Sequence, residues 1–348
     1  MGRPEQGARL FFSHHIHLPQ SGSRQAFAGG RRAERLMRFP QRRAVCAALA
    51  TVLLSGVLAA HAKANGIAEA RNAVVALLPA WPKGQANQEE PEGSAVVVKD
   101  GTWLVTADHV LGPAKSARIR LADGSVFPVE IIARDRASDL AVLRSSEALP
   151  ALEFAKEDPE VAEEVCAIGN AFGLGMTVSC GVVSAVARGG VGFNAVEDFI
   201  QTDASVNPGA SGGALVDGKG RLVGVLSAIF TKSSDGDLGV NFAASAPLVQ
   251  AVLASVTNYG RMEHISLGVA LEPTEPGPQP AGLTVRRLDE EGLAARAGFL
   301  PGDVILAVDG VAAMSVPALR GRLARAGSQP EISIRRNGKT ETLTIKTK

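Results

Sequence analysis

Short apolar runs separated by turn residues constrain the fold of this chain more than any other feature. From about residue 72 to residue 245, runs rich in β-branched side chains alternate with segments that contain glycine, aspartate or proline. Asp100-Gly101 joins two of these runs and is a strong hairpin signal. Strands this short and this dense predict antiparallel sheets or barrels. We therefore expect residues 66–260 to be mainly β, as two similar halves, with one helix at 247–256 capped by Ser245.

The character of the chain changes after about residue 260. Residues 265–348 mix strand-like runs with two short helical segments, at 293–298 and 316–326. A segment of this length fits a small independent α+β domain. We expect the boundary between the two regions to lie within residues 258–266.

Residues 1–64 are predicted to be a leader that contains a signal peptide starting at Met37. A basic segment is followed by an apolar run, and then by Ala60-His61-Ala62 and Ala62-Lys63-Ala64, which both fit an A-x-A cleavage site. The alternative is a retained membrane anchor, because the apolar run approaches spanning length. The histidines at positions 14, 15 and 17 precede this segment and are assigned no function.

Charge and cysteine content narrow the function classes. The formal net charge of +1 gives no electrostatic argument for binding nucleic acid. The sequence has no C-x-x-C pair or other metal-ligand spacing, so we expect no metal and no cofactor. Cys166 and Cys180 lie on two strand-like runs, and a turn centred near Phe172 and Gly173 would place them opposite each other. An exported chain can form that disulfide, although two buried thiols are the preferred interpretation.

One glycine-rich motif points to chemistry. Gly209-Ala210-Ser211-Gly212-Gly213 places a serine among residues that adopt backbone angles closed to other amino acids. Such a loop can direct several backbone N–H groups at one point beside a hydroxyl, as an acyl-transfer enzyme requires for its oxyanion. A surface turn is the alternative.

A serine nucleophile needs a base and an orienting acid. His109 is the candidate base, because His264 lies in the boundary segment. Among Asp108, Asp135 and Asp139 we choose Asp139, since the apolar run that follows could bury it beside the base. The order His109, Asp139, Ser211 is that of double β-barrel serine proteases, whereas an α/β-hydrolase needs the serine first and on a strand-turn-helix.

Several segments then occur in the order found in one known family. The chain resembles bacterial HtrA/Deg serine proteases from about residue 66 to residue 348, and the segments that carry the resemblance are GSAVVVKDGTWLVTADHV, ASDLAVL, AIGNAFGLGMTVSCGVVSAVAR, QTDASVNPGASGGAL and GVNFA. The resemblance implies a chymotrypsin/trypsin-like double β-barrel over residues 65–260 and a PDZ domain over residues 265–348. It implies that His109 is the general base, Asp139 its orienting carboxylate and Ser211 the nucleophile. The backbone N–H groups of Gly209 and Ser211, with Ala210 between them, would form the oxyanion hole.

The resemblance also implies two binding regions. A specificity pocket for aliphatic P1 side chains would be formed by Val206, Leu226, Ser227 and Ala228, although Val206 and Leu226 could instead be ordinary barrel core. A groove for peptide C-termini in the PDZ domain would be formed by Ser266, Leu267, Gly268, Val269, Leu319 and Leu323, and at least one of the last two is expected to be core. The basic side chains Arg320, Arg322 and Arg325 are expected to form a solvated helix face.

Two departures from the family pattern affect the site. Alanine replaces the usual asparagine at Ala107 and at Ala210. Because Ala210 lies in the loop around Ser211, we expect that loop to be ordered on demand by substrate and the PDZ domain. The expected function is that of a periplasmic, ATP-independent serine endopeptidase for unfolded or misfolded proteins, assembled as a homotrimer. The alternative is a chaperone or adaptor of protease fold with little or no activity.

Overall fold

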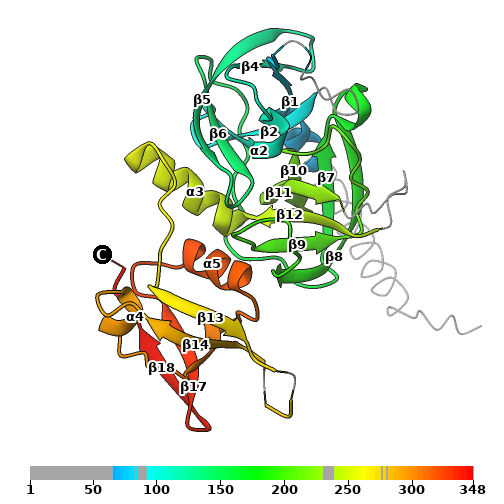
Figure 1. Cartoon of the computed structure of the whole chain (residues 1–348). Coiled ribbons are helices and arrows are strands. Elements are labelled where there is room, and N and C mark those ends of the chain that lie inside the picture. Colours follow the sequence, from blue (N-terminus) through cyan, green and yellow to red (C-terminus); the bar gives the residue numbers. More distant parts are fainter. Residues whose placement is uncertain are drawn as a thin grey trace, which may run out of the picture. The chain divides into compact units, whose positions relative to one another are not determined.

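Six strands of the N-terminal half close into a barrel in the computed structural model, which describes residues 66–82, 84, 92–229, 239–275, 277–279 and 281–347 (Figure 1). The strands follow the order β1-β2-β3-β6-β5-β4 around the barrel. Their apolar side chains alternate inward and fill the interior, with Leu77, Leu104, Ile119 and Leu143 fully buried. The elements are η1 (Arg71–Ala73), β1 (Val74–Pro79), β2 (Gly93–Val98), β3 (Trp103–Ala107), α2 (Asp108–Leu111), β4 (Ala117–Arg120), β5 (Val126–Asp135) and β6 (Leu140–Ser145).

A second six-stranded barrel follows in the chain. Its strand order is β10-β11-β12-β9-β8-β7, and Val165, Ile200, Leu215 and Leu226 lie in its core. The predicted double barrel is therefore confirmed. The elements are β7 (Glu164–Gly169), η2 (Ala171–Gly173), β8 (Thr177–Arg188), β9 (Phe199–Thr202), β10 (Ala214–Asp217), β11 (Leu222–Ile229) and β12 (Asn241–Ser245).

A shared apolar cluster joins the two barrels. Val105 and Leu140 of the first barrel pack in one buried cluster with Ile168 and Val225 of the second and with Leu248 of α3 (Ala246–Tyr259). The Ser245 side chain accepts a hydrogen bond from the Leu248 N–H at 3.4 Å, which confirms the predicted helix cap. Leu140, which follows Asp139 in the chain, belongs to this cluster, so the packing between the barrels helps to hold the start of β6.

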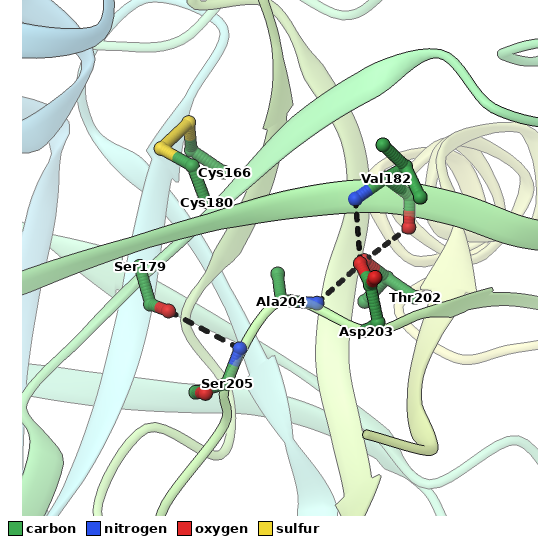
Figure 2. Close-up of a disulfide and its surroundings, with 8 residues drawn as sticks. All are labelled: Cys166, Ser179, Cys180, Val182, Thr202, Asp203, Ala204 and Ser205. Atoms are coloured by element: carbon green, nitrogen blue, oxygen red, sulfur yellow. Dashed lines mark hydrogen bonds between the residues drawn. A yellow bond between two sulfur atoms is a disulfide. The ribbon is translucent and has the colours of Figure 1, made fainter.

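A disulfide crosses the β7–β8 hairpin. Cys166 and Cys180 are direct cross-strand partners, and their sulfur atoms are bonded (Figure 2). The preferred interpretation of two buried thiols is wrong, because the register places the pair opposite each other; Cys166 is buried whereas Cys180 is exposed. Beyond the disulfide, β8 is bonded to the segment that follows β9, through Val182 N–H to the Asp203 carboxylate at 2.6 Å and Ser205 N–H to Ser179 Oγ at 3.1 Å.

The C-terminal region forms its own sheet in the order β13-β14-β15-β17-β18, with β16 paired to β15. Leu283, Phe299, Ile305 and Ile334 lie in a separate core. This architecture agrees with the predicted small α+β domain. The elements are β13 (Val269–Pro273), β14 (Leu283–Leu288), α4 (Leu293–Arg296), β15 (Val304–Val308), β16 (Val311–Ala312), α5 (Val316–Arg325), β17 (Glu331–Arg336) and β18 (Lys339–Thr344).

The predicted leader, residues 1–64, lies outside the described residues. Within the ranges that the structure describes, no helix is long and apolar enough to cross a membrane.

Candidate active site

The Asp139 carboxylate holds His109 at two points. Its Oδ2 lies 2.7 Å from His109 Nδ1, and its Oδ1 accepts the His109 backbone N–H at 2.9 Å. The Asp139 backbone oxygen also accepts the Asp108 N–H at 3.0 Å. Because the first N–H groups of a helix have no partner within it, Asp139 both satisfies the start of α2 and orients the imidazole ring. Nδ1 faces the carboxylate, so Nε2, on the opposite side of the ring, is directed away from it.

Asp139 reaches this position through an unusual backbone conformation. Its φ is +56°, in the left-handed region that non-glycine residues seldom adopt. It stands directly before β6, as the sequence predicted, and β6 pairs with the strand that leads into α2, through Ala107 and Leu140. The side chain is only 14% exposed, whereas that of His109 is 44% exposed. A shielded carboxylate beside an accessible imidazole is the arrangement that general-base catalysis requires.

The other two aspartate candidates have different partners. The Asp108 carboxylate pairs with Arg134, and Asp135 bonds His264 Nε2 at 2.9 Å and Ser138 Oγ. Burial favours a raised pKa for Asp135, but the hydrogen bonds from His264 and Ser138 outweigh it and hold that pKa below its ordinary value. The structure therefore brings Asp139, and neither alternative, to His109.

Ser211 lies in a loop whose backbone is bonded on several sides. The Ser94 backbone N–H donates to the Ser211 backbone carbonyl oxygen at 2.9 Å. Gly212 has φ +80°, and a Cβ there would lie 2.2 Å from both Ser94 O and Thr106 Oγ1. Only glycine permits this close approach of the loop to β2 and β3. The serine is thus placed beside the strand that leads into the His109 helix.

Sequence reasoning assigned Ser227 to substrate binding and missed its contact with Asp139. The Ser227 hydroxyl donates to Asp139 Oδ2 at 2.8 Å, across 88 positions of sequence. The β11–β12 register shifts between Leu226 and Ala228, so Ser227 stands at the irregularity. No local pattern predicts this bond, because it depends on closure of both barrels.

The remaining specificity candidates lie in or beside the core of the second barrel. Val206 is 2% exposed and Leu226 is fully buried, and both belong to the same cluster. Ala228 follows in β11. The Val206 and Leu226 side chains are thus part of the barrel core, and a pocket role for them stays a prediction.

All six predicted groove residues of the C-terminal domain line one cavity of about 320 Å³. β13 is an edge strand, since its ladder partner in the described sheet is β14, and edge strands can accept an added peptide strand. Gly268 has φ +69°, which suits the tight loop before that strand. Leu319 and Leu323 line the cavity and also lie in the domain core, so both interpretations hold for them. The cavity lining comprises Ala137, Ala195, Val196, His264, Ile265, Ser266, Leu267, Gly268, Val269, Leu271, Val316, Leu319, Arg320 and Leu323.

Comparisons with known proteins agree with both domains. Residues 93–225 match the family model of a trypsin-like peptidase domain, and residues 265–347 match that of a PDZ domain. The serine endoprotease DegS of Escherichia coli is 33% identical over 267 residues, which cover 73% of this chain and 75% of DegS. The chain belongs to the HtrA/Deg family of serine proteases.

Other HtrA/Deg proteins match at similar identity. The periplasmic serine endoprotease DegP of Escherichia coli is 34% identical over 271 residues, and a probable DegP-like protease of Halomonas elongata is 32% identical over 280 residues. The chain spans only 56% and 58% of the lengths of these two relatives. Among solved structures, an HtrA-type protease AlgW with a tripeptide superimposes with a TM-score of 0.64 at 36% identity, covering 82% of this chain and 96% of that chain.

The two departures from the HtrA/Deg pattern are accommodated by the backbone. Ala107 precedes α2 without a capping side chain, and Asp139 accepts N–H groups there instead. Ala210 is 5% exposed and its N–H donates to Asn207 O at 2.9 Å. A Cβ on Gly169 would lie 2.9 Å from the Ala210 Cβ, so glycine at position 169 permits the close approach of β7 to the loop. On-demand ordering of this loop stays a prediction.

One expectation about the PDZ helix is wrong. Arg322 is 2% exposed and pairs with the fully buried Asp198, and Arg325 bonds the same carboxylate at 2.9 Å. Burial lowers the pKa of Arg322 to about 10. The sequence pattern could not show this, because the acidic partner lies far away in the chain. Arg320 is exposed.

The described residues contain no group of three or more His, Cys, Asp or Glu side chains that could hold a metal ion.

Proposed function

We propose that this protein is an ATP-independent serine endopeptidase of extracytoplasmic protein quality control. The observation that carries the proposal is the double contact of Asp139 with His109 Nδ1 and the His109 backbone N–H. This contact fixes the tautomer and orientation that a histidine base needs. His109, Asp139 and Ser211 are the proposed triad.

The proposed mechanism is acyl transfer. His109 Nε2 takes the Ser211 hydroxyl proton while Oγ attacks the peptide carbonyl, and it then gives that proton to the leaving amine. The Asp139 carboxylate stabilises the imidazolium that forms. The N–H groups of Gly209 and Ser211 would donate to the oxyanion, with Ala210 shaping the loop between them. Water then attacks the acyl-enzyme, with His109 Nε2 again taking and returning the proton, which releases the second product and restores the Ser211 hydroxyl.

Substrate choice would involve both domains. Val206, Leu226, Ser227 and Ala228 are the proposed pocket for aliphatic P1 residues, and the main chain of β11 is proposed to pair with an extended substrate. The cavity between β13 and α5 supports binding of peptide C-termini. Unfolded or misfolded proteins present both features.

The family supports the remaining parts of the proposal. DegP relatives are named periplasmic, and the Cys166–Cys180 disulfide suits an oxidising compartment. We therefore propose a periplasmic location, reached through the predicted signal peptide. A homotrimer is proposed from the resemblance to the family alone.

Cleavage of an unfolded protein tests the proposal. The protein from residue 65 onward should degrade reduced casein, and Ser211→Ala should abolish this without lowering the melting temperature. Ser146→Ala, on an exposed turn, is the matched control and should cleave like wild type. Equal cleavage by wild type and Ser211→Ala would refute the triad. If wild type does not cleave but suppresses casein aggregation, the chaperone or adaptor alternative holds instead.

A further inference from the structure

The loop between β7 and β8 packs directly against the oxyanion loop, residues 207–211. The Phe172 N–H donates to the Pro208 oxygen at 2.7 Å. A Cβ on Gly209 would lie 2.4 Å from the Asn170 oxygen, so the two loops touch backbone to backbone. Because a peptide unit is planar and trans, its C=O and N–H point in opposite directions. The bond that fixes the Pro208 carbonyl therefore also fixes the direction of the Gly209 N–H, one of the two proposed oxyanion donors.

Asn170 determines the shape of this β7–β8 loop. It is fully buried, and its backbone N–H donates to Ser94 Oγ at 2.8 Å. Its Oδ1 accepts the Gly175 N–H at 3.0 Å, which closes the loop around Phe172. The Ser94 hydroxyl in turn donates to the Gly209 oxygen at 2.8 Å. Asn170 thus shapes the loop that binds the Pro208 oxygen, and through Ser94 it is also linked to the Gly209 oxygen.

Glu92 holds the remaining polar group of Asn170. The Asn170 Nδ2 donates to Glu92 Oε2 at 2.9 Å. Arg120, on β4 of the first barrel, donates to both carboxylate oxygens of Glu92, at 2.9 Å and 2.5 Å. The Glu92 side chain is 24% exposed and that of Arg120 is 34% exposed. A bidentate arginine–carboxylate pair fixes the orientation of the carboxylate more strictly than a single hydrogen bond does.

The charge of Glu92 strengthens the contact. The hydrogen bond from Arg120 holds the pKa of Glu92 below its ordinary 4.5, with burial acting against it and Asn170 adding to it. Glu92 is therefore ionised at neutral pH, and a bond to a charged acceptor is stronger than one to a neutral acceptor.

We propose that Glu92, held by Arg120, is a positioning residue for the oxyanion hole, acting through Asn170 and the β7–β8 loop on the Pro208–Gly209 peptide. The inference rests on the proposed protease function. It assigns a catalytic consequence to an ion pair on the first barrel that touches neither His109 nor Ser211. The proposed effect is on the transition state and the tetrahedral intermediate, because the negative oxygen is absent from the bound substrate.

Glu92→Gln tests the inference in the protein from residue 65 onward. Losing the ionised acceptor should lower kcat on an aliphatic-P1 chromogenic peptide about tenfold, less than the roughly hundredfold to thousandfold loss on deleting an oxyanion donor outright. KM should stay within about twofold, since only transition-state binding is affected. Inhibition by a peptide boronate should weaken in parallel with kcat. Glu341→Gln removes an exposed carboxylate that pairs with Arg336 in the PDZ domain and should leave all these values unchanged.

A second variant separates positioning from general stability. In Glu92→Gln/Asn170→Asp the new amide can donate to the new carboxylate, so the contact is restored with its polarity reversed. The double variant should recover part of the kcat lost in Glu92→Gln. Unchanged kcat in Glu92→Gln, a fall in melting temperature with no change in kcat or boronate affinity, or no recovery in the double variant would each overturn the inference. Failure of the protease proposal is distinguishable, because wild type itself would then be inactive on the peptide.

Discussion

Removal of the Cys166–Cys180 disulfide should destabilise the protease domain by an amount that its position predicts. The two cysteines are 14 positions apart and face each other across the β7–β8 ladder. Six cross-strand pairs, from Glu164–Val182 to Gly169–Thr177, already hold this hairpin in the folded state. The crosslink therefore acts mainly by restricting the unfolded chain. For a closed loop of about 15 residues, the chain-entropy model gives about 3 kcal/mol.

The expected shift in melting temperature follows from the size of the domain. For domains of about 150–250 residues, 1 kcal/mol changes the melting temperature by roughly 2–4 °C. Cys166→Ala/Cys180→Ala should therefore melt about 6–12 °C below wild type. Both tryptophans, Trp81 and Trp103, lie in the first barrel region, so tryptophan fluorescence reports the protease domain without a PDZ contribution.

A dithiol reductant provides the control. It should lower the melting temperature of wild type by a similar amount and leave the double variant unchanged, which separates loss of the crosslink from loss of the buried sulfur of Cys166. A melting temperature of the double variant within about 2 °C of wild type would refute the argument, as would equal reductant sensitivity of both proteins.

Two further substitutions test the site and the groove. Ser227→Ala removes a hydrogen bond to Asp139 Oδ2. Since hydrogen bonds to charged groups contribute about 1.5–3 kcal/mol, kcat/KM should fall about tenfold or more in steady-state peptide assays. An unchanged kcat/KM would show that Asp139 does not need the Ser227 hydroxyl. Gly268→Val places a side chain at φ +69°, where a Cβ would lie 2.9 Å from Gly292 Cα. The affinity for a fluorescent peptide with a free apolar C-terminus, measured by anisotropy, should fall about tenfold. Equal affinity would argue against the proposed loop.

Several features of the fold and the site follow from neighbouring residues alone. The Asp100-Gly101 hairpin, the Ser245 cap of α3 and the strand that follows Asp139 were predicted and are present. Each depends on turn chemistry, capping or periodicity within a few positions. The same holds for Gly209 and Gly212 beside Ser211, whose left-handed backbone angles favour glycine at those positions.

Contacts between distant segments could be identified only from the tertiary structure. Sequence proximity favoured neither the Ser227–Asp139 bond nor the Glu92–Asn170 contact, because the partners are 88 and 78 positions apart. Arg322 looked like a solvated side chain on its helix, yet it is buried against Asp198. The pattern of a helix or strand specifies which face is polar, but only barrel closure and domain packing decide which polar group that face meets. The sequence by itself thus determined the β architecture and the candidate nucleophile, base and acid, whereas the tertiary structure decided which groups orient and support them.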